Sequence, residues 1–192
     1  MKRIFLPISI VCLALVSLTA TVYAQTKTFS INPEESKLEY SFKSTLHPVH
    51  GVAHQFSGNF LVDDTAGLDV KSGRVVVDSK QLDSRNKKRD RNMYDMLDVL
   101  KFPKINYAIN QFVEIRQTVV GSYRGVLKGA LIIKDVTKDV DVNVNFQETD
   151  NGYFLEGECE ISLKMFDLNP PSVLGLIKVS DPVTIHFQIQ LN

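Results

Sequence analysis

The sequence predicts an all-β protein, an antiparallel barrel of about eight strands with one short helix-bearing insertion. Short segments alternate apolar and polar residues, as half-buried strands do, and turn-forming residues separate them at hairpin spacing. A single long interruption, 83–104, has a helical period instead. An antiparallel sheet of this size is expected to close or nearly close on itself, because closure removes exposed edges.

Alternation is clearest in the segment 36–44, where Leu38, Tyr40 and Phe42 share one face and polar residues the other. Segments 140–146 and 183–191 follow the same pattern. The pattern does not tell which face points inward, because a one-residue slip inverts a whole strand. Five further strands are expected, at 57–63, 73–79, 105–115, 122–134 and 153–164.

The interruption at 83–104 predicts one helix. Met93, Met96, Leu97 and Leu100 recur at the spacing of one helix face, and Pro103 is expected to end the helix. The methionines make this face adaptable. We expect the helix to close one end of the barrel.

Residues 1–24 have the features of a secretory signal peptide, namely a basic start, an apolar run and small residues before the expected cleavage site after Ala24. The apolar run is shorter than the roughly 20 residues of a membrane-spanning helix. Cleavage would leave 25–192 as one periplasmic or secreted domain, without a transmembrane span. That domain carries 20 basic and 22 acidic residues, so its charge does not favour nucleic acid. Its one cysteine, Cys159, cannot form an internal disulfide and is expected to be a small core residue.

Three of the four histidines, His47, His50 and His54, lie within eight positions. On a helix they would share a face and could hold a metal ion, but Pro48 and Gly51 disfavour a helix here. On an extended strand His47 faces away from the other two, which lie about 13 Å apart. We therefore expect no metal site in this segment.

Known catalytic motifs are missing from the sequence. It contains no G-x-S-x-G, no glycine-rich phosphate loop, no H-E-x-x-H and no C-x-x-C. Asp90, Asp95 and Asp98 could form a pair of acids, but a solvated helix face explains them better. The sequence therefore predicts neither an enzyme nor a cofactor.

Four blocks, spread over nearly all of 29–192, carry a resemblance to a known family. The most specific reads KRDRNMYDMLDVLKFPKINY and contains Arg89-Asp90, Asp98 and Phe102-Pro103. The others are INPEESKLEYSFKS, HGVAHQFSGNF and LKGALIIKDVTKDVDVNV. Through these blocks the sequence resembles the YceI-like family, exported bacterial proteins also described as polyisoprenoid-binding and lipocalin-like.

This resemblance implies an eight-stranded, lipocalin-like barrel whose apolar pocket holds a long-chain isoprenoid, such as a polyprenyl chain or isoprenoid quinone, or a fatty-acyl lipid. Such a barrel is just wide enough for one ligand. Arg89 and Lys101 flank the helix and are candidates to pair with a polar head group. The expected pocket residues are Leu38, Tyr40, Phe42, Met93, Met96, Leu97 and Phe166.

Other readings of the sequence stay open beside a lipid carrier. An eight-stranded outer-membrane barrel fits the size, the signal and the last strand, but the chain has no Trp and ends in a polar Asn192. A stress-response structural protein would have a filled core and no ligand. An enzyme acting on an isoprenoid would need a catalytic set that the sequence does not show. A homodimer is compatible with the sequence.

Overall fold

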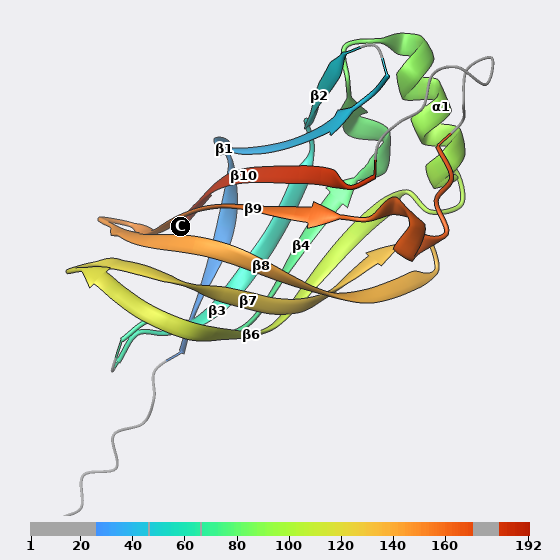
Figure 1. The fold of residues 1–192 in the computed structure, drawn as a ribbon. Helices are drawn as coiled ribbons and strands as arrows, with labels where there is room; N and C mark the ends of the chain where they lie inside the picture. The colour runs from blue at the N-terminus through green and yellow to red at the C-terminus, as the bar shows by residue number, and fades with distance from the viewer. Residues whose placement is uncertain (1–25, 46, 66, 171–180) are drawn as a thin grey trace, which may run out of the picture.

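An antiparallel sheet curls round and closes on itself in the computed structural model, which describes residues 26–45, 47–65, 67–170 and 181–192 (Figure 1). The expected signal peptide lies outside these residues. Around the ring the strand order is β1-β3-β4-β6-β7-β8-β9-β10, and β10 pairs back with β1. The predicted eight-stranded antiparallel barrel is confirmed. The ring strands are β1 (Thr26–Lys43), β3 (Phe56–Asp63), β4 (Asp69–Asp78), β6 (Lys104–Val119), β7 (Ser122–Ile133), β8 (Val136–Thr149), β9 (Gly152–Ile161) and β10 (Val183–Leu191).

Two short strands lie outside the ring and were not predicted. The histidine-rich segment forms β2 (Pro48–Ala53), which pairs with the second half of β1, and β5 (Leu82–Asp83) pairs with β2. The first half of β1 pairs with β3 instead. The wall of the barrel therefore divides near the end of β1, beside the helix.

Strand β1 is longer than the predicted segment 36–44. It starts at Thr26 and contains a bulge, because its register with β10 jumps between Asn32 and Lys37. The Ser36 hydroxyl donates to the Asn32 carbonyl (2.6 Å) and accepts from the Gln190 N–H (2.9 Å). At the bulge, the Ser36 side chain therefore replaces hydrogen bonds that regular pairing between β1 and β10 would have made.

The helix α1 (Lys87–Leu97) is present but ends earlier than predicted. Asp98 adopts the left-handed conformation (φ 47°), and its N–H bonds to the carbonyls of Asp95 and Tyr94. Leu100 therefore lies beyond the helix and is 85% exposed, so its predicted place on the apolar face is wrong. The described residues also contain two 3₁₀ turns, η1 (Ser79–Gln81) and η2 (Leu163–Phe166). No helix among the described residues is both long and apolar enough to cross a bilayer.

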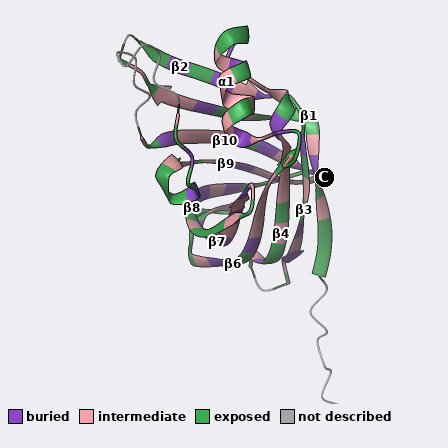
Figure 2. Cartoon of the chain, turned by 90° about the vertical axis from the view of Figure 1, so that its right-hand side faces the viewer, coloured by how far each residue is buried: buried purple, intermediate pink, exposed green. Residues whose placement is uncertain are grey.

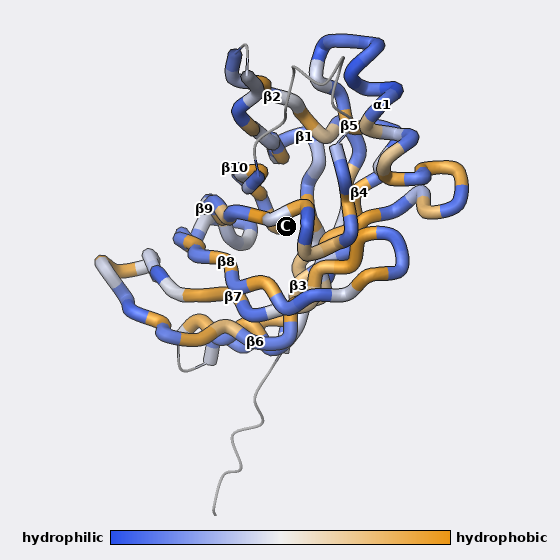
Figure 3. Tube along the Cα trace, turned by 45° about the vertical axis from the view of Figure 1, so that its right-hand side comes forward, coloured by the Kyte–Doolittle hydropathy of each residue, from blue (hydrophilic) through white to orange (hydrophobic). Residues whose placement is uncertain are grey.

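More buried and more exposed positions alternate along the ring strands, as do apolar and polar residues (Figures 2 and 3). On β8, for example, Val140, Val142 and Val144 alternate with the exposed Asp141 and Asn143. Burial along the inward set is uneven: Val144 is buried, whereas Val140 is only half-buried. A half-buried inward side chain in a closed barrel indicates empty space beside it.

Candidate functional site

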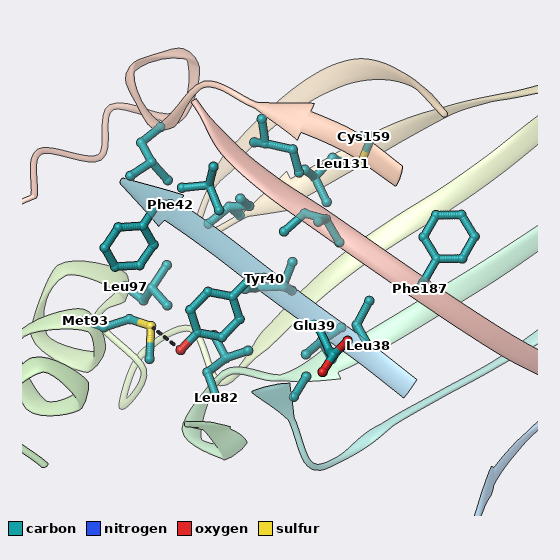
Figure 4. A pocket seen from close by; sticks show the side chains of 18 of the residues that line it. Leu38, Glu39, Tyr40, Phe42, Leu82, Met93, Leu97, Leu131, Cys159 and Phe187 are labelled. Carbon is teal, nitrogen blue, oxygen red and sulfur yellow. Dashed lines mark hydrogen bonds between the residues drawn. The ribbon is translucent and has the colours of Figure 1, made fainter. Parts of the chain in front are cut away.

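A cavity of about 520 Å³ occupies one half of the barrel interior (Figure 4). This volume lies within the roughly 300–1,000 Å³ of small-molecule sites. The cavity reaches the surface between the β1–β2 turn and the start of α1, where the exposed His47, Asn86 and Lys88 line it. Its inner wall consists of apolar side chains from the ring, including Val75, Val77, Ile109, Leu127, Leu131, Val142, Leu155, Ile185, Phe187 and Ile189.

The predicted face of β1 points into this cavity. Leu38, Tyr40 and Phe42 all line it, and the rings of Tyr40 and Phe42 stack with their centroids 6.5 Å apart. The Tyr40 ring lies over Gly51 of β2, where an added Cβ would come within 2.2 Å of the ring. A larger residue at position 51 would therefore displace the ring.

Helix α1 contributes its apolar face to the same cavity. Met93, Met96 and Leu97 line it, and the Tyr40 hydroxyl donates to the Met93 sulfur over 3.5 Å (Figure 4). Burial, with a smaller effect of Asp90, raises the pKa of Tyr40, so its hydroxyl stays protonated and can act as a donor. Helix and β1 therefore meet across the cavity.

Arg89 lies at the cavity mouth, held by the turn that precedes α1. Its Nε donates to the Ser84 hydroxyl and its Nη2 to the Ser84 carbonyl, each over 2.7 Å. Asp90 is buried and accepts from the Ser84 N–H (2.9 Å) and the Ser84 hydroxyl. The Asn86 side chain caps the helix by accepting from two backbone N–H groups. The Arg-Asp pair thus fixes the shape of the mouth.

Two of the predicted site residues lie elsewhere. Phe166, in η2, is 1% exposed and packs with Leu97, Leu131 and Leu168 in a second core cluster, outside the cavity lining. Lys101 follows the helix, and its ammonium lies 4.8 Å from the centre of the Phe102 ring, away from the lining. The geometry therefore leaves Arg89 as the head-group candidate at the mouth.

Sequence reasoning missed most of the polar mouth and much of the inner wall. Ser44, Ser84, Asn86 and Asn92 line the cavity, as does Lys88. The signal that could have found them is topological, because the turns after alternate strands of an antiparallel barrel lie at the same end. Deep inside, the Tyr107 hydroxyl lies 2.8 Å from the Val140 carbonyl and 3.1 Å from that of Leu127, so its polar atom is satisfied by the wall.

Cys159 lies in the wall, pointing into the cavity (Figure 4). It is half-buried, and burial, together with Glu158, raises the pKa of its thiol to about 11. A protonated thiol is a poor nucleophile. Cys159 is therefore an apolar residue of the cavity wall. Its thiol lies beside the cavity and not inside a filled core.

The histidines do not converge. His47 Nδ1 lies 2.9 Å from the Pro48 carbonyl, and His54 Nε2 lies 3.2 Å from Asp83 Oδ2. His50 is exposed on β2. Within the described ranges, His, Cys, Asp and Glu side chains form no group of three that could hold a metal ion.

The comparisons with known proteins agree with this geometry. The YceI-like domain matches residues 29–191, nearly the whole described chain. The chain belongs to the YceI-like family. None of the curated proteins compared with the chain matches it.

Solved structures of similar fold include members of this family. The crystal structure of Burkholderia cenocepacia BcnA is 18% identical, with a TM-score of 0.67 over 84% of this chain and 99% of that chain. A polyisoprenoid binding domain from Saccharophagus degradans, implicated in plant cell wall breakdown, is 13% identical, with a TM-score of 0.69 over 85% and 97%. The Campylobacter jejuni YceI protein is 18% identical, with a TM-score of 0.58 over 75% and 85%. At these identities the likeness shows the YceI-like fold.

Proposed function

We propose that this YceI-like protein is an exported lipid carrier that holds a long-chain isoprenoid or fatty-acyl amphiphile in its barrel, for transport, storage or sequestration. The observation that carries the proposal is the apolar cavity of about 520 Å³. Each methylene buried there contributes about 0.8 kcal/mol. A single chain can therefore bind without any specific polar contact. The polyisoprenoid binding of the Saccharophagus degradans relative points to the same ligand class.

The distribution of polar groups favours an amphiphile over a plain hydrocarbon. Polar and basic lining residues, among them Lys88, Arg89 and Asn92, gather at the mouth, whereas the inner wall is apolar. Arg89 uses two of the five guanidinium N–H groups on Ser84. The remaining donors suit a carboxylate or phosphate, so we place the head group at the mouth and the chain inside.

No chemical step is part of this proposal. Three titratable groups of the cavity wall, those of Tyr40, Tyr107 and Cys159, have raised pKa values because burial disfavours their charged forms. Groups kept neutral in this way suit storage of a chain without reaction. We propose the periplasm or the extracellular space as the location, on the basis of residues 1–24.

The polarity of the barrel disfavours the outer-membrane alternative. A transmembrane barrel has an apolar outer band and a polar interior. Here the outward positions of β9 are Glu156, Glu158 and Glu160, all exposed, and Asp141 and Asn143 face outward on β8. This is the reverse of the arrangement that a membrane barrel needs.

The proposal is tested by native mass spectrometry of the protein purified without detergent, followed by organic extraction of whatever co-purifies. We expect one bound species with an isoprenoid or long acyl chain. The variant Ile185→Asp places a charge in the cavity wall and should lose this species. The matched control Gln188→Asp places the same charge on the exposed outer face of the same strand and should keep it.

A bare mass, with no uptake when polyprenyl, quinone and fatty-acyl lipids are each offered, contradicts a carrier. It would favour a structural protein.

A further inference from the structure

The interior of the barrel is divided along its axis into a hollow half and a filled half. On most ring strands, the inward residues near the helix line the cavity and those farther along do not. On β8, Val140 and Val142 line it, whereas Val144 and Phe146 do not. The residues of the filled half include Phe29, Ile31, Val62, Val70, Phe112, Val144, Phe146, Tyr153 and Leu191.

Four aromatic side chains contact one another in the filled half, and we call Phe29, Phe112, Phe146 and Tyr153 the aromatic plug. The Phe146 ring lies 5.0 Å from that of Phe112 and 6.4 Å from that of Tyr153, and the latter lies 5.2 Å from the Phe29 ring. Two of the pairs are edge-to-face, with interplanar angles of 82° and 80°. Such pairs are favourable beyond the area they bury. The plug thus spans the barrel from β1 to β6.

The plug lies directly beneath the cavity. Phe146 pairs across β8 and β9 with Leu155, and Phe112 pairs across β6 and β7 with Leu127. Both Leu155 and Leu127 line the cavity. Removing the Phe146 ring would therefore extend the cavity along the barrel axis, in the direction in which a bound chain would grow.

We infer that the aromatic plug sets the maximum length of the chain that the barrel accepts, with Phe146 as the main determinant. This inference rests on the proposed function, because it concerns the same cavity. Each methylene that enters the cavity should strengthen binding about fourfold. Once the end of the chain meets the plug, further methylenes stay outside and add nothing.

The test is the affinity of a homologous series of straight-chain fatty acids and of polyprenols, measured by displacement of a fluorescent apolar probe. For the unmodified protein we expect affinity to rise with length and then to stop rising at a defined length. In Phe146→Ala the rise should continue over additional carbons, so that the longest ligands gain about tenfold or more relative to the shortest ones. Phe154→Ala, whose ring is next to the plug in sequence but faces outward from β9, is the matched control and should keep the original limit.

Folding is checked by circular dichroism, and Phe146→Leu, which keeps an apolar side chain, answers the same question if Phe146→Ala does not fold. A folded variant with the same length limit as the unmodified protein overturns the inference while leaving the carrier in place. Absence of binding at every length, in the unmodified protein too, contradicts the proposed function itself.

Discussion

Aromatic rings and the glycines opposite them shape the cavity wall residue by residue. Tyr40 covers Gly51, and Phe187 covers Gly157, where an added Cβ would come within 2.6 Å of the ring. Each glycine lets a large ring lie flat against the wall, so that the space beyond the ring stays open. Position 159, two residues after Gly157, carries a small thiol that faces the same space.

The Cys159 thiol is expected to react slowly with alkylating reagents in the folded protein. Because burial raises its pKa to about 11, the folded protein holds little thiolate at pH 8. Alkylation by iodoacetamide should be about a hundredfold slower than in the urea-unfolded chain, and should accelerate about tenfold per pH unit up to pH 10. Rates are measured by mass spectrometry of the modified peptide.

In chains that retain Cys12, the variant Cys159→Ser shows how much of the measured alkylation comes from Cys12. A bound chain should slow the reaction further, because it fills the space beside the thiol. Equal rates in the folded and unfolded protein at pH 8 would show that Cys159 is not held in the wall as described.

Among the elements, strand β1 pairs with three other strands. It pairs with β3 through its first half and with β2 through its second, and it closes the ring by pairing with β10. The bulge after Asn32 lets one strand meet these requirements, because it offsets the two halves. Ser36 holds the offset through its two backbone hydrogen bonds.

Replacing Ser36 by Ala should therefore loosen the closure of the ring. The Gln190 N–H would lose its acceptor, which costs about 1–3 kcal/mol when the group stays buried. We expect the free energy of unfolding in urea to fall by about this amount, and amide exchange at Gln190 to accelerate. Ser57→Ala, at an exposed position of β3, is the control and should change neither quantity.

Much of the element order could be predicted, because half-buried strands impose a period of two on the sequence. The segments 57–63, 122–134 and 183–191 lie within a residue of β3, β7 and β10. The first half of β1 was missed because Pro33 and two acidic residues resemble a turn. The early end of α1 was missed because Asp98 in the left-handed conformation has no strong sequence signal.

The candidate site was predictable only in part. The face of β1 with Tyr40 and the helix face with Met93 line the cavity as expected, because both patterns mark apolar faces that must be buried. Phe166 lies near the last turn, as expected, but its ring packs into a second core cluster with Leu97 and Leu131 instead of lining the cavity. Its place depends on tertiary packing that the sequence pattern does not contain.

At the level of the whole molecule, the barrel is filled at one end and hollow at the other. The same residue types occupy both halves: Val140 lines the cavity, whereas Val144, on the same face of the same strand, is buried against the aromatic plug. Composition and alternation cannot distinguish these halves. In the filled half the rings of the aromatic plug contact one another across the interior, with Phe146 against both Phe112 and Tyr153.

The two valines permit a matched test of this division. In Val144→Phe the ring must enter a packed core, so we expect the free energy of unfolding to fall by about 1–3 kcal/mol. In Val140→Phe the cavity accommodates the ring, so stability should change by less than about 1 kcal/mol, while the affinity for a long-chain ligand falls about tenfold or more. Urea unfolding and probe displacement measure the two effects. Equal destabilisation by both substitutions would mean that the half of the barrel beside α1 is as tightly packed in solution as the plug, and a barrel packed throughout could not hold a chain.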